Sequence, residues 1–371
     1  MLITFVTQGS FNNHATLKRA TGMASPLMEA GHSVTILMQD STVNREKIML
    51  ECPQADVCWY PAGLSLLKER KLKQDALKQL QPDLVWICAV GLRNWVFRPK
   101  QSTIMLADHS ELFSSMDSGV FRNIFNFIAE WVHLMSFDVH VCASRYLERF
   151  YKRRLKLLGK GDKVHYSPYA YHPKMMQTDM PSSEKLFRRW GGRKAIIYMG
   201  SFWENYGFWD MLHAFRCLAQ QRKDFVAVFA GSGPEKEKGI NWVKTNSFED
   251  VIQIEGYLAE EDLPAYFTAA YAFLSPLRDT VQDKARCPSK LFMYLPYKKP
   301  IVTCAIGEAL ELFGDDGNYF EPGNVESLAN ALEQVLNSTK RSNSVAPEKH
   351  TYAARVDSFL DWYKDNIDGR Y

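Results

Sequence analysis

The residues with the clearest chemistry lie in residues 286–302, RCPSKLFMYLPYKKPIV. Pro288 and Ser289 come directly before an amphipathic segment, which is typical of the start of a helix. The first N–H groups of a helix have no partner within it, so such a start attracts anions, and Lys290 adds a positive charge in the first turn. Two interpretations remain open here: a phosphate-binding helix start, or an ordinary helix start that faces solvent.

Two further groups of candidate residues follow short apolar runs in the first half of the chain. The loop QGSFNNH, residues 8–14, follows the first run, and Gly9 would let a substrate approach the backbone closely. His109 follows Asp108 at the end of the run STIMLAD. A lone histidine is commonly a core or loop residue, whereas a histidine at the end of a strand is well placed for binding, and both interpretations stay open.

These residues need elements that hold them in place, and the first 144 residues predict a regular alternation. A β-branched run at residues 2–8 is followed by a helical segment at 15–29 and a strand at 33–38, which together predict a βαβ unit. The alternation continues with strands at 55–60, 83–90, 102–108 and 138–144 and helices at 64–81 and 120–135. Short apolar strands that alternate with helices predict a parallel sheet covered on both faces.

The alternation stops at residues 157–190, which are rich in turn residues and which we expect to be irregular. A second series follows, with strands at 194–200, 225–233, 251–258, 271–277 and 299–305 and helices at 209–220, 260–270 and 325–337. We therefore expect an α/β protein with two doubly wound Rossmann-like domains facing each other across a cleft. The predicted domains are 1–170 and 185–349, with a last helix in 350–371 packing back on the first domain.

Composition places the chain among soluble globular proteins. Hydrophobic residues make up 46% and charged residues 23% of the 371 residues, and the net charge of +3 argues against nucleic acid as a partner. The seven cysteines are scattered and none has CxxC spacing, so we expect neither a disulfide framework nor a metal site. No signal peptide or membrane-spanning segment is recognised, and the expected location is the cytoplasm.

Five stretches of the second half, in order, resemble the donor domain of GT-B glycosyltransferases of the retaining family 4 type. They are YMGSFWENYGFWDMLHAF, VFAGSGPE, IEGYLAEEDLPAYFTAAYAFLSPLRD, CPSKLFMYLPYKKPIVTC and GNYFEPGNVESLANALEQVL, and they cover about 140 residues. The first half is similar more weakly, through QGSFNNH, MEAGHSVTIL, ADHSEL and DVHVCASRYLERF. The resemblance implies a nucleotide-diphosphate sugar as donor, most simply a UDP-sugar, and no cofactor or metal.

The resemblance also assigns residues to tasks. It implies that the backbone around Cys287–Lys290 holds the diphosphate and that His109 positions the donor sugar as the catalytic residue. The residues assigned to the donor are Gly200, Ser201, Tyr206, Gly231, Tyr257, Leu258, Asp283, Cys287, Pro288, Ser289, Lys290 and Met293. The residues assigned to the acceptor are Gly9, Ser10 and His14.

The sequence departs from the family pattern at the donor site. The family has acidic residues on both sides of the phosphate turn, eight positions apart, and these positions fall on Ala285 and Met293. An Arg and a Lys that neutralise phosphate in the family correspond to Ser201 and Tyr206. Neither Ala285 nor Met293 can accept a strong hydrogen bond from ribose. Either the donor is bound in a changed way, or the site no longer catalyses.

Two basic segments, residues 66–80 and 145–163, mix Lys and Arg with leucines and aromatic residues at helical spacing. Such helices can lie on an anionic membrane surface, or they can be the solvated faces of domain helices. The helix at 120–135 is apolar on most faces, and we expect it in the core rather than at a membrane. A peripheral position on the inner face of the cell membrane is thus a second expected location.

We therefore expect a hexosyltransferase-type glycosyltransferase that moves a sugar, with retention, from a nucleotide-diphosphate donor to a glycan or lipid-linked acceptor. The expected context is the synthesis of cell-surface polysaccharide or glycolipid. The alternative is a non-catalytic GT-B protein that binds active glycosyltransferases, which the departures at the donor site favour. A GT-B sugar-nucleotide epimerase is a third interpretation, disfavoured because the sequence offers no convincing set of acidic catalytic residues.

Overall fold

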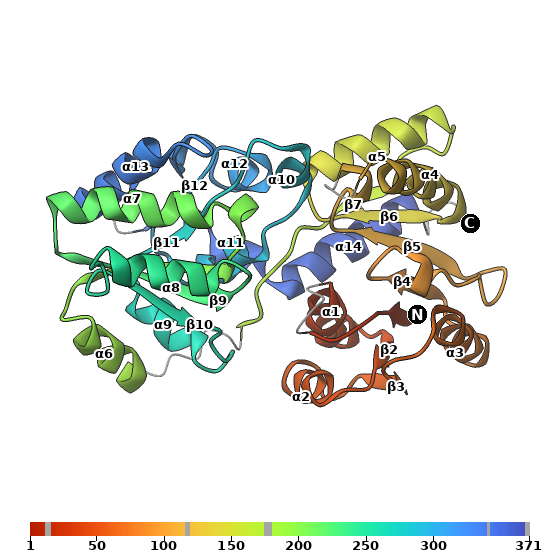
Figure 1. Ribbon diagram of the computed structural model, residues 1–371. Coiled ribbons are helices and arrows are strands. Elements are labelled where there is room, and N and C mark those ends of the chain that lie inside the picture. Colours follow the sequence, from red (N-terminus) through yellow and green to blue (C-terminus); the bar gives the residue numbers. More distant parts are fainter. Residues whose placement is uncertain (12–15, 116–118, 174–179, 340–341, 368–371) are drawn as a thin grey trace. The chain divides into compact units, whose positions relative to one another are not determined.

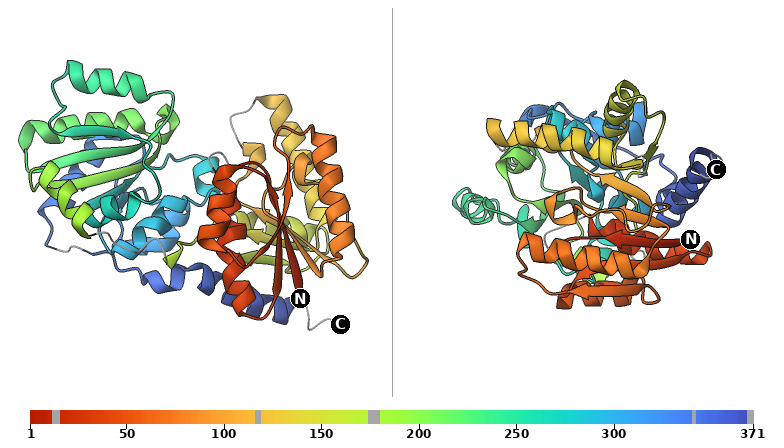
Figure 2. Two further views of the ribbon diagram at one scale, coloured as in Figure 1. Left: turned by 90° about the horizontal axis from the view of Figure 1, so that it is seen from below. Right: turned by 90° about the vertical axis from the view of Figure 1, so that its right-hand side faces the viewer.

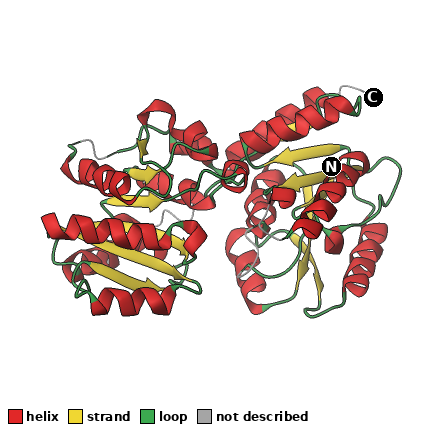
Figure 3. Cartoon of the chain, turned by 45° about the horizontal axis from the view of Figure 1, so that its top comes forward, coloured by secondary structure: helices red, strands yellow, loops and turns green. Residues whose placement is uncertain are grey.

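The computed structural model describes residues 1–11, 16–115, 119–173, 180–339 and 342–367. The chain divides into two compact units, and each is described by itself. Unit 1 comprises Met1–His172, Ala285–Cys287 and His350–Tyr371, and unit 2 comprises Pro173–Lys284 and Pro288–Lys349. Each unit consists of strands that lie between layers of helices (Figure 3).

Unit 1 is built on a seven-stranded parallel sheet with strand order β3-β2-β1-β4-β5-β6-β7. Its strands are β1 Leu2–Val6, β2 Ser33–Gln39, β3 Asp56–Tyr60, β4 Leu84–Ile87, β5 Ile104–His109, β6 Val139–Cys142 and β7 Val164–Tyr166. Its helices are α1 Leu17–Glu29, α2 Thr42–Glu51, α3 Leu66–Leu80, α4 Val120–Ser136, α5 Arg145–Leu157 and α14 Tyr352–Asn366. The 3₁₀ turns are η1 Leu92–Asn94 and η2 Phe113–Ser115.

The C-terminal helix α14 lies beside α1 on unit 1, as Figures 1 and 2 show. Tyr352 and Phe359 of α14 are buried in the same hydrophobic cluster as Phe5 and Trp86. The ring of Tyr352 fills the space beside Gly22 of α1, where an added Cβ would lie 2.4 Å from a ring carbon. Gly22 thus permits the close approach of the two helices.

Unit 2 is built on a six-stranded parallel sheet with strand order β10-β9-β8-β11-β12-β13. Its strands are β8 Lys194–Ser201, β9 Phe225–Ser232, β10 Ile252–Gly256, β11 Ala272–Ser275, β12 Ile301–Thr303 and β13 Asn318–Tyr319. Its helices are α6 Met180–Arg189, α7 Phe208–Gln221, α8 Lys236–Thr245, α9 Leu263–Ala269, α10 Val281–Ala285, α11 Ser289–Tyr294, α12 Gly307–Phe313 and α13 Val325–Asn337. The short 3₁₀ turns are η4 Glu204–Tyr206, η5 Leu295–Tyr297 and η6 Gly314–Asp316, and a further turn, η7 Pro347–His350, lies where the chain passes from unit 2 to unit 1.

The predicted fold class of two doubly wound parallel sheets is confirmed. The expectation of irregular structure at 157–190 is wrong in part, because β7 and α6 lie within that stretch. The placement of the helix at 120–135 in the core is also wrong. In α4 the buried side chains are Glu130, His133 and Leu134, while Phe121 on the opposite face is 90% exposed. None of the described helices is long and apolar enough to cross a membrane.

Candidate functional site

The carboxyl ends of β8 and β9 are in close backbone contact at the candidate donor site. Gly200 and Gly231 are register partners, with φ of +156° and +146°. A Cβ added to Gly231 would lie 1.8 Å from the carbonyl oxygen of Gly200. Only glycine fits here, since a side chain would overlap the neighbouring backbone and disfavour the positive φ. The loops after β8 and β9 therefore begin side by side at one point of the sheet edge.

Lys290 lies directly over this point. It belongs to the first turn of α11, which follows Pro288. Its Nζ is 4.3 Å from the centre of the Tyr198 ring, and a Cβ added to Gly200 would lie 2.7 Å from it. The absence of a side chain at Gly200 thus makes room for the ammonium group. The arrangement places a cation beside the start of a short helix at the end of β8, which is suited to an anion such as phosphate.

Two further cations that the sequence reasoning missed lie at the same edge of the sheet, one in a loop and one at the start of α8. The Arg278 guanidinium, in the loop after β11, lies 2.7 Å from the Asp210 carboxylate and donates to the Glu204 carbonyl. Lys236 lies next to Gly256 at the end of β10, with its Nζ 3.2 Å from where a Cβ would be. The signal that could have found Arg278 is its place just after a buried strand, the same signal that singled out His109.

Asp283 has a carboxylate directed at its own loop. The backbone N–H of Arg278 donates to this carboxylate over 2.6 Å, and the N–H of Asp283 donates to Thr280 Oγ over 3.1 Å. The side chain is buried. Asp283 therefore fixes the loop that carries Arg278.

The other residues assigned to the donor are placed as follows. Ser201 ends β8, Tyr206 ends the turn η4, Tyr257 is 74% exposed after β10, and Leu258 follows it. Met293 is 6% exposed in α11 and Ala285 is fully buried, so both positions where the family has acids are apolar and covered. Pro288 and Ser289 lead into α11 in unit 2.

Cys287 falls in unit 1, unlike Pro288, Ser289 and Lys290. Its Sγ accepts a hydrogen bond from the backbone N–H of Tyr169 over 3.4 Å. Two residues earlier, the carbonyl of Ala285 accepts a 2.5 Å hydrogen bond from Ser144 Oγ. Residues 285–287 are therefore fixed by contacts with unit 1, and the phosphate turn assigned from the sequence begins at the point where the chain enters unit 2.

His109, the predicted catalytic residue, ends β5 and is 4% exposed. Its Nε2 lies 3.0 Å from His140 Nδ1, and its ring packs on Tyr151 with centres 4.0 Å apart. Burial, together with the neighbouring His140, holds the pKa of His109 well below its ordinary value. The imidazole is therefore neutral near pH 7, where it can donate or accept a hydrogen bond but cannot act as an imidazolium acid.

Asp108, the residue before His109, is committed to a buried ion pair. Its carboxylate lies 2.9 Å from Nε of Arg19 and accepts a 3.0 Å hydrogen bond from the Trp86 indole. Burial raises the pKa of the Asp108 carboxyl, and Arg19 opposes that shift. Arg19 also donates to the carbonyl of Ser167 over 2.7 Å. The pair thus joins α1, β5 and the segment after β7, and sequence spacing gave no sign of it.

The loop after β1 is held by Asn44 of α2, which is fully buried. The Asn44 amide donates to the carbonyl of Gly9 over 3.1 Å, and its oxygen accepts from the N–H of Phe11 over 3.1 Å. Gly9 has φ of +73°, and Ser10 is half-buried. His14 lies outside the described residues. The described part of this loop is therefore a fixed surface at the carboxyl end of β1.

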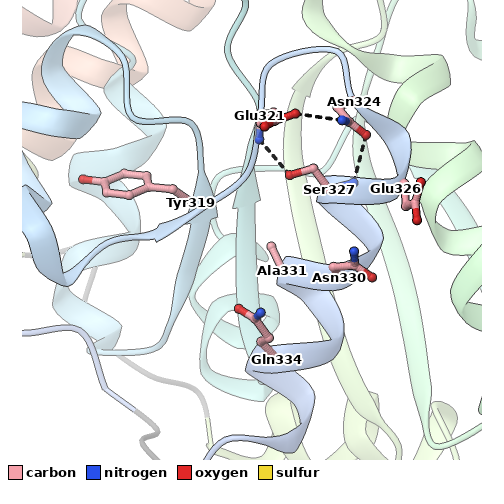
Figure 4. A pocket seen from close by; sticks show the side chains of 8 residues that line it. All are labelled: Tyr319, Glu321, Asn324, Glu326, Ser327, Asn330, Ala331 and Gln334. Atoms are coloured by element: carbon pink, nitrogen blue, oxygen red, sulfur yellow. Dashed lines mark hydrogen bonds between the residues drawn. The ribbon is translucent and has the colours of Figure 1, made fainter.

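A polar pocket of about 300 Å³ lies beside the start of α13 in unit 2 (Figure 4). Its lining residues are Tyr319, Glu321, Asn324, Glu326, Ser327, Asn330, Ala331 and Gln334. Asn324 caps the helix by accepting from the Ser327 N–H and donates to Glu321, whose N–H donates to Ser327 Oγ. These groups satisfy one another, and none of the residues predicted from the sequence lines the pocket. Within the described residues, no group of three or more His, Cys, Asp or Glu side chains is placed to hold a metal ion.

Comparison with known proteins gives a family match over part of the chain. Residues 193–338 match the family described as "Glycosyl transferases group 1". A 2-deoxystreptamine N-acetyl-D-glucosaminyltransferase from Niallia circulans is 21% identical over 184 residues, a match that covers 49% of this chain and 46% of that relative. The chain thus matches about half the length of this curated relative.

Solved structures extend the likeness to the whole fold. The structure of Anabaena Alr3699/HepE in complex with UDP and glucose superposes with a TM-score of 0.73 at 14% identity, covering 98% of this chain and 100% of that one. Sucrose-phosphate synthase from Thermosynechococcus elongatus superposes with a TM-score of 0.75 at 16% identity and full coverage of both chains. The protein therefore has the fold of GT-B glycosyltransferases, and residues 193–338 match the glycosyl transferases group 1 domain of that class.

Proposed function

We propose that the protein is a glycosyltransferase that transfers a hexose, with retention, from a nucleotide-diphosphate sugar to a glycan or lipid-linked acceptor. The observation that carries the proposal is the position of Lys290 over Gly200 at the carboxyl edge of the unit 2 sheet. In doubly wound sheets ligands bind beyond this edge, and a phosphate needs a cation and free N–H donors there. We place the diphosphate beside Pro288–Lys290 and Gly200, and propose that a UDP-sugar is the donor, as UDP is bound in the Anabaena neighbour.

In the proposed reaction the bond between the anomeric carbon and the diphosphate oxygen breaks, and the acceptor oxygen bonds to that carbon on the same face. The proton of the acceptor hydroxyl passes to the leaving diphosphate. Negative charge grows on the leaving diphosphate, so a fixed cation at Lys290 stabilises the transition state more than the bound donor. Arg278 is the second cation at this edge and is held in place by Asp210 and Glu204. These side chains supply the charge that a metal ion would otherwise give, and we propose that no metal is required.

The remaining residues have supporting tasks in this proposal. His109, neutral and hydrogen-bonded to His140, positions the donor sugar. The loop of Gly9 and Ser10, fixed by Asn44, contacts the acceptor. Synthesis of a cell-surface glycan or glycolipid at the inner face of the membrane is the context that fits a lipid-linked acceptor.

The test is nucleotide affinity after Lys290→Glu. Replacing the cation by an anion removes a charge-assisted contact and adds repulsion, so the Kd for UDP measured by calorimetry should rise by about 10- to 100-fold. Lys223→Glu is the matched control, because Lys223 is exposed in the loop before β9, at the amino edge of the same sheet. Equal affinity in wild type and both variants would remove the phosphate assignment.

A second candidate function is a non-catalytic GT-B protein that binds active glycosyltransferases. The observation that favours it is the pair of buried apolar residues, Ala285 and Met293, where the family has acids. The two candidates separate in a donor screen. A glycosyltransferase releases nucleotide diphosphate from one of a set of UDP-, GDP-, ADP-, CDP- and TDP-sugars when a cell-envelope extract supplies the acceptor, whereas the binding protein releases none.

A further inference from the structure

The outward face of α4 in unit 1 is apolar and exposed. Phe121 is 90%, Ile124 53%, Phe125 55% and Ile128 56% exposed, and these four residues are called the α4 stripe. Their spacing of three and four residues puts them on one face of the helix. Val120 and Met135 of the same helix are also exposed. Monomeric proteins rarely leave such an apolar face of a surface helix exposed to water.

The α4 stripe lies on the face of the helix opposite the one that packs on unit 1. The opposite face is buried through Glu130, His133 and Leu134. Glu130 accepts from the N–H and hydroxyl of Ser114 and pairs with Arg154 of α5 over 3.0 Å. The inner face is thus held by specific polar contacts, which fix the rotation of the helix and keep the stripe facing outward.

A basic stripe lies on the neighbouring helix α5, which is drawn beside α4 in Figure 1. Arg149, Arg153 and Lys156 are exposed, and they lie opposite the buried face of Leu147, Tyr151 and Leu155. The two helices are joined by Arg154, whose guanidinium lies 4.9 Å from the centre of the Phe127 ring of α4. The apolar and the basic stripes therefore belong to one surface of unit 1.

The exposed charges of α4 and α5 have one sign. Besides the basic stripe, Arg122 of α4 is exposed. Both carboxylates of the two helices are held in ion pairs: Glu130 with Arg154, and Glu148 with Arg145 and Lys152. What the two helices present outward is thus a set of cations beside large apolar side chains. That combination matches an anionic lipid surface, whose headgroups attract the cations while the acyl region takes up the apolar side chains.

We propose that α4 and α5 dock unit 1 on an anionic lipid bilayer, with the α4 stripe entering the interface and the basic stripe contacting the headgroups. A second copy of the chain is the less suitable occupant, because a symmetric contact would bring the cations of the basic stripe against each other or against the apolar stripe of the second copy. The inference does not depend on glycosyl transfer. The sequence indicated only the basic segment as a membrane contact. The structure adds α4, which supplies the apolar part of the binding free energy.

The test is sedimentation with vesicles of phosphatidylcholine alone and of phosphatidylcholine mixed with phosphatidylglycerol in equal parts. The full chain should bind the mixed vesicles strongly and the neutral ones weakly. The triple variant Phe121→Ser, Ile124→Ser, Phe125→Ser should bind the mixed vesicles at least about 100-fold more weakly, because three apolar side chains no longer leave water. The variant Arg149→Gln, Arg153→Gln, Lys156→Gln should lose about 100-fold at low salt and less at high salt.

The controls come from α3, the other basic helix of unit 1. One control replaces exposed lysines (Lys68→Gln, Lys71→Gln, Lys78→Gln), and a second replaces exposed leucines (Leu67→Ser, Leu72→Ser). Both should leave vesicle binding within about twofold, since neither the apolar stripe of α4 nor the basic stripe of α5 is changed. The stripe residues are exposed, so the melting temperature and the affinity for UDP should match wild type in every variant. Equal binding to neutral and mixed vesicles, unchanged binding of the α4 variant, or an α4 variant that alters only the oligomeric state in ultracentrifugation would each overturn the proposal.

Discussion

Acidification from about pH 7.5 to about pH 5 is expected to destabilise unit 1 through its buried histidines. His109, His133, His140 and His165 are each no more than 8% exposed. Burial lowers the pKa of His140 and of His165 to about 3 and that of His133 to about 4. The folded unit therefore keeps these imidazoles neutral down to a pH at which the unfolded chain has already bound the protons.

The sign of the pH effect on stability follows from the number of protons that the folded and unfolded states bind. Below the ordinary histidine pKa of about 6.5 the unfolded state binds more protons than the folded state, so the free energy of unfolding falls as the pH falls. Stability is fully present above about pH 6.5 and is lost below it by about 1.4 kcal/mol per pH unit for each such histidine. At about pH 5 each contributes a loss of about 2 kcal/mol, and His133, His140 and His165 together about 6 kcal/mol. A domain with a total stability of about 5–15 kcal/mol would lose much of it.

The assay is urea unfolding at fixed ionic strength, read by hydrogen exchange of peptides from β4, β5 and β6 so that unit 1 is observed separately. The change is read between about pH 7.5 and about pH 5, because depressed carboxyl groups such as Asp224, with a pKa of about 2, titrate below this window.

His165→Phe isolates one of the histidines. The imidazole lies against the rings of Phe359 and Trp362, and among the described residues its Nε2 has no hydrogen-bond partner. The variant should lose about 2 kcal/mol less than wild type over the same pH change, whatever its stability at neutral pH. His32→Gln, at a half-buried histidine, is the control and should change the pH dependence less. A wild-type loss below about 1 kcal/mol, or a His165→Phe curve parallel to wild type, would refute the reasoning.

Two further predictions concern unit 2. Met293→Glu places an acid at a position that is 6% exposed and should raise the affinity for UDP. Its loss of melting temperature should be smaller than that of Leu291→Glu, a fully buried control in the same helix. An equal loss of melting temperature without a gain in affinity would show that Met293 is a core packing residue. Gly231→Ala should destabilise unit 2 by more than about 3 kcal/mol, because its Cβ would overlap the Gly200 carbonyl at a positive φ. Gly314→Ala, at a positive φ with open space around it, should cost about 1 kcal/mol, and equal effects of the two changes in urea unfolding would contradict the close contact.

The sequence was sufficient to predict the two parallel sheets, because buried strands such as β4 and β9 are short apolar runs between helical segments. It was not sufficient to place α4. Periodicity shows that a helix has an apolar face, and the usual assumption sends that face to the core. In α4 the packing face is instead held by Glu130 and its partners Arg154 and Ser114, which come from other elements and carry no local signal.

The sequence predicted those site residues that local features single out. It did not predict contacts between residues that lie far apart in the chain. Lys290 was recognised because it starts a helix after a proline. The position of its ammonium group over Gly200 was not predicted, since this contact joins two segments that only the folded sheet brings together. The same holds for Arg278 with Asp210 and for Arg19 with Asp108. His109 was recognised by its place at the end of a strand, but its neutrality follows from burial beside His140.

The polar groups at the two sheet edges differ in what they already contact, and this difference bears on the proposed chemistry. In unit 1, Asp108 is paired with Arg19, and His109 is a neutral ring bonded to His140. His109 can therefore orient a hydroxyl but does not act as an imidazolium acid near pH 7. In unit 2, the cations Lys290 and Arg278 are held by a ring face and by Asp210. Transfer of a sugar needs charge stabilisation at the leaving diphosphate more than it needs proton transfer in the first step. An acid missing at Met293 would then weaken ribose binding without removing the groups that stabilise the leaving group, which favours the transferase over the non-catalytic alternative.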